Sequence, residues 1–141
     1  MSTPTLTSER FATRFERVTH DVDFCVVGGG MAGLCAALAA ARHGARVALM
    51  QDRPVLGGNA SSEMRVHICG ADRHNLIPYL RETGILEELR MENLRRNPNR
   101  NFSVWDLLLH EKAQAEPNLI LLLNCSCLDA AMEGDRIASV T

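Results

Sequence analysis

The chain has 141 residues, of which 46% are hydrophobic and 23% are charged, and its formal net charge is -2. This composition is typical of a globular domain with a moderate core, and the charge gives no electrostatic reason to expect nucleic acid or an anionic membrane as a partner. The first twenty residues lack the apolar core of a signal peptide, and no segment has the apolar length that spans a bilayer. We therefore expect a cytoplasmic protein.

The first structured region predicts a strand, a helix and a second strand. Phe24–Val27 is a short apolar run, typical of a strand buried on both faces. An alanine-rich helix is predicted over Met31–His43, with Gly44 placed to cap it. A second apolar strand is predicted over Ala45–Met50. This order is typical of a parallel βαβ unit.

The rest of the chain predicts a helical insertion, a third strand and a hairpin. An irregular stretch is expected over Asp52–Arg73, followed by two short helices within Leu76–Leu94 that Thr83 and Gly84 interrupt. The next helix is expected to run from the N-cap Ser103 to before Pro117, with an apolar face of Val104, Leu107 and Leu108. A strand over Asn118–Leu123 and a hairpin of Cys127–Met132 and Ile137–Val140 complete the prediction. The predicted fold class is α/β, with a Rossmann-like βαβ parallel sheet and the start of an antiparallel hairpin. We expect residues 1–20 to form an N-terminal arm. Because a newly started strand pair leaves edges uncovered, we expect residues 21–141 to be the N-terminal part of a longer domain.

A glycine-rich turn separates the first strand from the first helix. Gly28, Gly30 and Gly33 fit the pattern G-x-G-x-x-G. The first allows the tight turn, the second lets a pyrophosphate approach the backbone, and the third lets the helix pack closely on the sheet. The helix start at Met31 and Ala32 offers free N–H groups and a positive dipole end to phosphates. A strand before this pattern and a helix after it favour a dinucleotide site over a bare turn.

The end of the second strand departs from the usual dinucleotide-binding pattern. An acidic residue is expected there to bind the adenosine ribose. The chain has Gln51 followed by Asp52. Either the uncharged Gln51 replaces the acid, or the strand end twists so that Asp52 serves. We favour Gln51 as the ribose-binding residue, with a backbone contribution from its neighbours.

The five cysteines do not indicate a disulfide framework, because their number is odd and their positions are scattered. Cys125 and Cys127 form a C-x-C pair, but no second ligand pair has metal spacing. We predict no metal site.

Two segments together resemble a known family. Asp23–Ala37, which contains the first glycine pattern, and Gly57–Glu63, which reads GGNASSE, resemble FAD-dependent oxidoreductases of the glutathione-reductase-like fold, in the branch related to fumarate reductase flavoproteins. The resemblance covers roughly Asp21 to the end. It implies FAD as cofactor and hydride transfer between a small-molecule substrate and the flavin. It also implies that residues 21–141 are the N-terminal part of an FAD-binding domain, so this chain alone is expected to bind FAD poorly and to be inactive.

The resemblance also implies further cofactor contacts. Gly57, Gly58, Asn59 and Ser61 correspond to the segment that passes close to FAD in this family. Cys127 corresponds to a residue whose backbone binds adenine.

Catalytic residues are less well indicated. Glu63, Arg65 and His67 alternate, so in an extended segment they share one face. Arg65 is suited to hold a substrate carboxylate and His67 to move a proton, but a surface Glu–Arg pair and an ordinary loop histidine also explain this pattern. Two other functions stay open: an NAD(P)-linked dehydrogenase, and a nucleotide-binding remnant without catalysis. The sequence specifies neither the substrate, the electron acceptor nor the oligomeric state.

Overall fold

The computed structural model describes residues 16–69, 71, 77 and 80–141. Its elements in chain order are β1 (Phe24–Val27), α2 (Met31–Arg42), β2 (Val47–Gln51), the 3₁₀ turn η1 (Gly58–Ala60), α3 (Gly84–Arg96), α4 (Phe102–Gln114), β3 (Leu119–Leu123), β4 (Ala130–Glu133) and β5 (Arg136–Val140). The predicted α/β class is confirmed, as are the first βαβ unit, the third strand and the hairpin. Gly44 follows the first helix with a φ of 92°, and its N–H donates to the Ala41 carbonyl at 3.0 Å, which confirms it as the cap.

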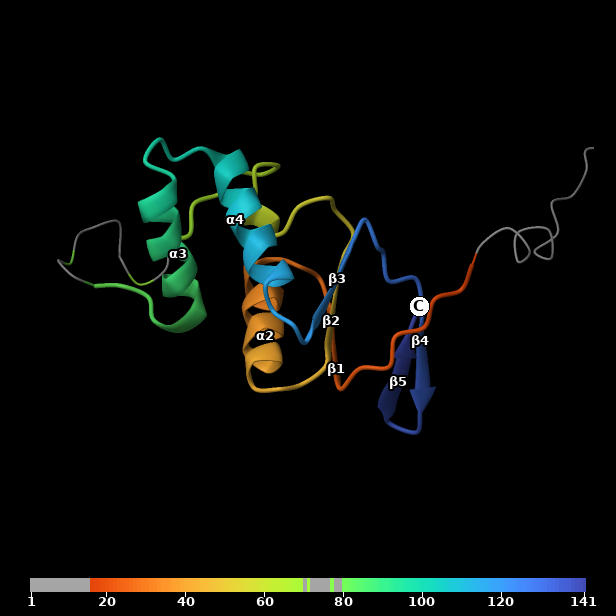
Figure 1. The fold of residues 1–141 in the computed structure, drawn as a ribbon. Helices are drawn as coiled ribbons and strands as arrows, with labels where there is room; N and C mark the ends of the chain where they lie inside the picture. The colour runs from red at the N-terminus through yellow and green to blue at the C-terminus, as the bar shows by residue number, and fades with distance from the viewer. Residues whose placement is uncertain (1–15, 70, 72–76, 78–79) are drawn as a thin grey trace, which may run out of the picture.

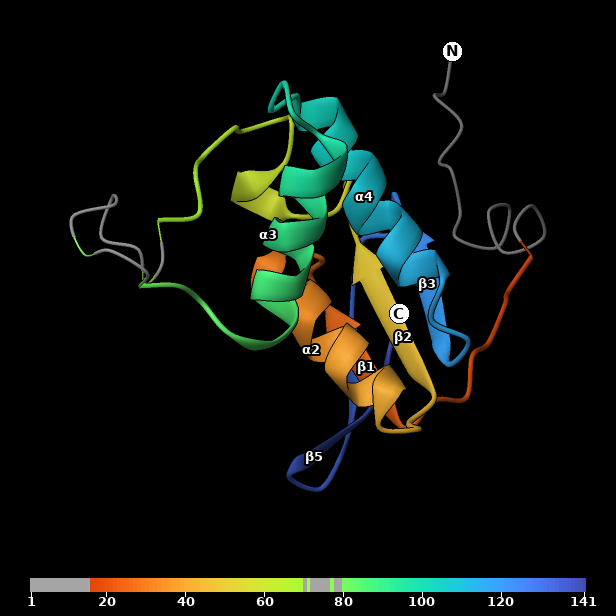
Figure 2. The ribbon, with the colours of Figure 1, turned by 60° about the vertical axis from the view of Figure 1, so that its left-hand side comes forward.

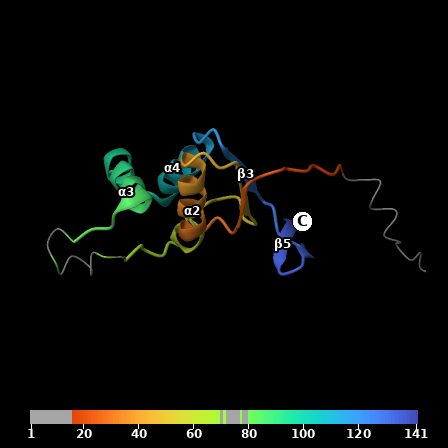
Figure 3. The same ribbon diagram turned by 90° about the horizontal axis from the view of Figure 1, so that it is seen from below.

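The main sheet has three parallel strands in the order β1-β2-β3. Figures 1 and 3 show that all three α-helices lie on the same face of this sheet. Both crossovers move in the same direction along the sheet, and crossovers of one hand then place their helices on one face. The core lies between this face and the helices, and its largest fully buried side chains include Leu34, Leu38, Leu49, Leu56, Leu108 and Leu109.

The prediction that the first strand is buried on both faces is wrong. Phe24 is 45% exposed and Val27 is 54% exposed, because β1 is the edge strand of the described sheet. The central strand β2 is the buried one, with every residue covered. An apolar run alone indicates a strand but does not give its position in the sheet.

The helical insertion also differs from expectation. A single helix, α3, follows Thr83, and the described residues before it, Ile77 and 80–83, are not helical. The remainder of the first predicted short helix lies outside the described residues. The N-cap of α4 is Asn101, not Ser103: its side chain accepts a hydrogen bond from the Ser103 N–H at 2.8 Å. The buried face of α4 consists of Trp105, Asp106, Leu108, Leu109 and Ala113, so Val104 and Leu107 are not its core residues.

The hairpin of β4 and β5 is antiparallel and turns at Gly134 and Asp135. It lies on the side of the sheet opposite the helices, as Figures 1 and 3 show. Nearly all of its side chains are exposed. In the described part of the chain, no helix is long and apolar enough to span a membrane.

Ion pairs connect elements that are distant in sequence. In Figure 2, α2 lies beside both α3 and α4, and Arg42 of α2 donates to Glu88 of α3 at 2.7 Å and to Glu116 after α4 at 2.5 Å. At the start of β1, Asp23 accepts from the Arg46 guanidinium at 2.8 Å and from the Arg46 backbone N–H at 2.9 Å. These groups are partly or largely exposed, so each pair stabilises the fold only modestly.

The Asp23–Arg46 pair has a measurable consequence. Hydrogen bonds from the Arg46 side chain and backbone lower the pKa of the Asp23 carboxyl from 3.8 to about 2. A pKa lowered by folding stabilises the folded state above the unfolded value, and this contribution is lost as the pH falls from about 4 towards 2. We expect NMR titration to give Asp23 a pKa near 2, and Arg46→Gln to return it towards 3.8. An Asp23 pKa near 3.8 in the unmodified chain would contradict the pair.

Candidate functional site

The glycine-rich turn lies at the carboxyl end of β1. The Gly28 N–H donates to the Met50 carbonyl at 2.8 Å, which joins the turn to the end of β2. A Cβ atom at Gly33 would lie 1.9 Å from the Gly28 carbonyl oxygen. Only glycine at this position lets α2 start so close to the turn.

The N-terminus of α2 has free hydrogen-bond donors. Its N-cap is Gly30, which provides no side chain, and the first intrahelical bond runs from the Leu34 N–H to the Gly30 carbonyl at 2.8 Å. Within the described residues, the backbone N–H groups of Ala32 and Gly33 have no partner, and the first turn holds no acidic residue. A Cβ at Gly30 would meet nothing within 4 Å, so the side-chain position of the N-cap is open. This end of the helix is therefore suited to an anion.

The second glycine pair packs directly on the first turn. The Gly57 N–H donates to the Gly29 carbonyl at 2.8 Å, and Gly57 forms a parallel bridge with Gly30. A Cβ on Gly58 would lie 3.1 Å from the Gly30 Cα, and both glycines of the pair have positive φ. The two predicted glycine segments, far apart in the sequence, are thus neighbours beside the start of α2.

Gln51 has a role that the sequence did not indicate. It is buried; its Oε1 accepts from the Gly29 N–H at 2.7 Å and its Nε2 donates to the Val55 carbonyl at 3.1 Å. Both polar ends of this side chain are thus bound to the protein backbone. Asp52, by contrast, is exposed. The only signal for this arrangement was an amide in place of the expected acid.

A hollow of about 320 Å³ lies beside the turn, lined by Val27, Gly28, Met50, Asp52, Cys125, Ser126 and Cys127. The chain after β3 forms one wall, because the Cys125 N–H donates to the Gln51 carbonyl at 2.9 Å. The N–H groups of Ser126 and Cys127 have no partner in the described part of the chain. The predicted residues Gly28, Asp52 and Cys127 are therefore brought together.

The loop after the second glycine pair is held from α4. Asp106, buried on α4, accepts from the Ser62 N–H at 3.0 Å. Ser61 is fully buried, and its hydroxyl accepts from the Glu63 N–H at 3.3 Å, so this side chain points inside the loop. Asn59 is exposed, with its carbonyl bonded to the Val66 N–H at 2.9 Å. The contribution of Asp106 was missed, because Ser62 lies far from it in the sequence.

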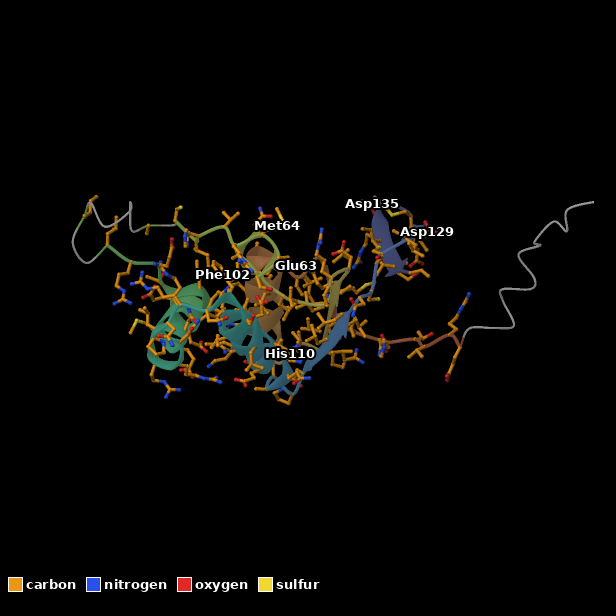
Figure 4. The ribbon with its side chains drawn as sticks, turned by 90° about the horizontal axis from the view of Figure 1, so that it is seen from above. Glu63, Met64, Phe102, His110, Asp129 and Asp135 are labelled. Carbon is orange, nitrogen blue, oxygen red and sulfur yellow. The ribbon has the colours of Figure 1, made fainter. Side chains whose placement is uncertain are left out.

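Glu63, Arg65 and His67 do not form the expected extended row. Arg65 has a φ of 56°, which breaks the alternation, and its Nε donates to the Ser62 carbonyl at 3.0 Å. Glu63 lies 3.5 Å from the Arg53 guanidinium, and the His67 ring centroid lies 6.3 Å from that of Phe102. Figure 4 shows Glu63 and Met64 on the loop near Phe102, away from Asp129 and Asp135 of the hairpin region. Among the described residues, no group of three or more His, Cys, Asp or Glu could hold a metal ion.

Comparison with known proteins gives one family. A family model described as FAD dependent oxidoreductase matches residues 23–141. The chain is 47% identical over 53 residues to a fumarate reductase (cytochrome) of Shewanella frigidimarina, which is 38% of this chain and 9% of that protein. It is 45% identical over 42 residues to a soluble pyridine nucleotide transhydrogenase of Marinobacter nauticus, which is 30% of this chain and 9% of that protein. It is 43% identical over 58 residues to a sarcosine oxidase alpha subunit of Corynebacterium sp.. These residues are 41% of this chain and 6% of that protein. The matches thus span less than a tenth of these relatives.

The close approach at Gly33 can be tested by adding one methyl group. We expect Gly33→Ala to lower the free energy of unfolding by at least about 2 kcal/mol, because the new Cβ overlaps the Gly28 carbonyl. Gly30→Ala is the matched control, since its Cβ enters open space. Urea unfolding followed by circular dichroism measures both. Equal stability of the two variants would contradict the packing at Gly33.

Substitutions at the neighbouring residues Gln51 and Asp52 are expected to change the free energy of unfolding by different amounts. Gln51→Leu leaves the Gly29 N–H and the Val55 carbonyl unpaired, and should cost about 2–5 kcal/mol. Asp52→Asn changes an exposed side chain and should stay within about 0.5 kcal/mol of the unmodified chain. The same unfolding measurement tests both variants. A harmless Gln51→Leu would show that its hydrogen bonds do not support the turn.

Proposed function

The chain belongs to the FAD-dependent oxidoreductase family, and we propose that its described residues hold the adenosine diphosphate half of FAD. The observation that carries this proposal is the meeting of the two glycine segments at the free N-terminus of α2. The pyrophosphate would accept hydrogen bonds from the N–H groups of Ala32 and Gly33. It would pass over Gly30, where no side chain intervenes, and beside Gly57 and Gly58.

We assign the adenosine ribose to Asp52 in place of Gln51. Asp52 is exposed and lines the hollow beside Gly28, whereas both polar ends of the Gln51 side chain are bound to backbone groups. A carboxylate accepts hydrogen bonds from ribose hydroxyls, as expected at the end of the second strand of such folds. In this assignment Gln51 positions the turn and does not touch the cofactor.

The adenine is assigned to the wall of the hollow. The free N–H of Cys127 is a donor for a ring nitrogen, so Cys127 acts through its backbone. On the other side of the site, the exposed amide of Asn59 is available to the phosphates or the flavin side of the cofactor. Ser61 is fully buried and supports this loop from within.

The proposed activity is oxidation or reduction of a small molecule, with hydride transfer between the substrate and the flavin. Bound FAD supplies this chemistry, accepting or donating hydride at its ring system, while the protein contributes position and charge. Arg65 and His67 are exposed on the loop after the second glycine pair. We retain them as substrate contacts, since a guanidinium binds a carboxylate and an imidazole moves a proton.

Titration of the 141-residue chain with FAD tests the assignment. Two-dimensional NMR should show the amides of Gly30, Met31, Ala32 and Cys127 shifting as FAD is added. Asp52→Ala should weaken FAD binding by about 10- to 100-fold, because hydrogen bonds to a charged group are lost. Asp135→Ala, which removes an exposed carboxylate in the hairpin turn, is the matched control and should bind as the unmodified chain does.

The same titration with NADH distinguishes the alternative of an NAD(P)-linked dehydrogenase. We expect FAD to bind more tightly than NADH. A folded chain that shifts no resonance with FAD, or that binds NADH more tightly, would overturn the proposal.

A further inference from the structure

Three thiols gather on the face of the sheet away from the helices. Val26 of β1 packs against the core, so its neighbours Cys25 and Val27 point to the opposite face. Val27 lines the hollow together with Cys125 and Cys127. Cys25 and Val27 are separated by one strand repeat, about 6.7 Å. All three cysteines are free.

Their electrostatics agree with this placement. Burial raises the pKa of the Cys25 thiol, and the neighbouring thiols of Cys127 and then Cys125, in their charged form, raise it further. Like charges disfavour one another at short range, which agrees with the placement of the three thiols on one face of the sheet. Cys25 and Cys127 are both exposed, so a dissolved reagent can reach either thiol.

The backbone around Cys127 is loosely held. Cys125 is anchored to Gln51, and the N–H groups of Leu128 and Asp129 donate to the Thr141 carbonyl at 2.6 and 3.1 Å. Between these anchors, the N–H groups of Ser126 and Cys127 have no partner within the described residues. A shift of Cys127 towards β1 therefore breaks no hydrogen bond of its own backbone, and it gives up only the bond from the Cys127 Sγ to the Asp129 carbonyl at 3.6 Å.

We propose that Cys127 and Cys25 are a redox pair that controls cofactor access to the hollow, an inference that rests on the proposed FAD site. The Cys127 thiolate attacks one oxygen of hydrogen peroxide, the O–O bond breaks, and a sulfenic acid and water form after proton transfer. The Cys25 thiol attacks this sulfur, the S–O bond breaks, and a second water leaves as the disulfide forms. Two thiols lose two electrons in total, and one peroxide gains them. The disulfide draws the chain at Cys127 over the hollow and excludes adenosine.

Peptide mass spectrometry tests the pairing without reference to FAD. The 141-residue chain is treated with hydrogen peroxide, alkylated with iodoacetamide and digested without reduction. We expect a peptide pair that links Cys25 to Cys127, absent in Cys127→Ser and in Cys25→Ser. Cys69→Ser, which removes an exposed thiol outside the hollow, is the matched control and should keep the link. A Cys125–Cys127 disulfide, or no disulfide in a folded chain, would overturn the pairing.

FAD titration of the same samples tests the control of access. Peroxide treatment should weaken FAD binding by at least about tenfold, dithiothreitol should restore it, and Cys25→Ser should be insensitive to peroxide. A mapped Cys25–Cys127 disulfide with unchanged FAD affinity would refute the control of access. If the reduced chain fails to bind FAD, both the proposed function and the control of access are wrong. The peptide map still decides whether Cys25 and Cys127 are a redox pair.

Discussion

The peptide groups of Gly29 are held from two sides. Its N–H donates to the buried Gln51 side chain at 2.7 Å, and its carbonyl accepts from the Gly57 N–H at 2.8 Å. These two bonds join the glycine turn, the end of β2 and the second glycine pair. Gly30, the next residue, is the N-cap of α2. Fixing Gly29 therefore fixes the direction of the free donors of the helix, and every other part of the site is arranged around that direction.

The local elements could be predicted from the sequence, because each depends on its own residues. The alternation of apolar runs, glycines and an alanine-rich stretch indicates β1, α2, β2 and the hairpin, and the G-x-G-x-x-G pattern indicates the turn. The contacts that connect them could not be predicted. The side chain of Gln51 bonds to Val55 because the chain turns back after β2, and Asp106 reaches Ser62 only when α4 docks. Such contacts depend on tertiary packing and leave no local signal.

The wrong predictions for the N-cap of α4 and for the burial of β1 have a common origin. In both cases the sequence offers more than one suitable position and does not indicate which is used. Asn101 and Ser103 are both good N-caps; Asn101 takes the position because Asn97 also bonds its backbone, at 2.8 Å to the N–H and 2.7 Å to the carbonyl. In the same way, an apolar strand fits the centre or the edge of a sheet. The position of β1 follows from the two parallel crossovers, which put β2 in the middle.

The pairing of β2 with β3 has a consequence for how the site assembles. Residues 47–51 pair in register with residues 119–123, although two helices and a long loop separate them in the chain. Closing so long a loop is slow and entropically costly, whereas the contacts among β1, α2 and β2 are short in sequence. The half proposed to bind phosphate is thus expected to form early, and the hollow proposed for adenosine is completed only when β3 docks. A nucleotide that binds both halves selects the fully folded chain, which couples cofactor capture to the last folding step.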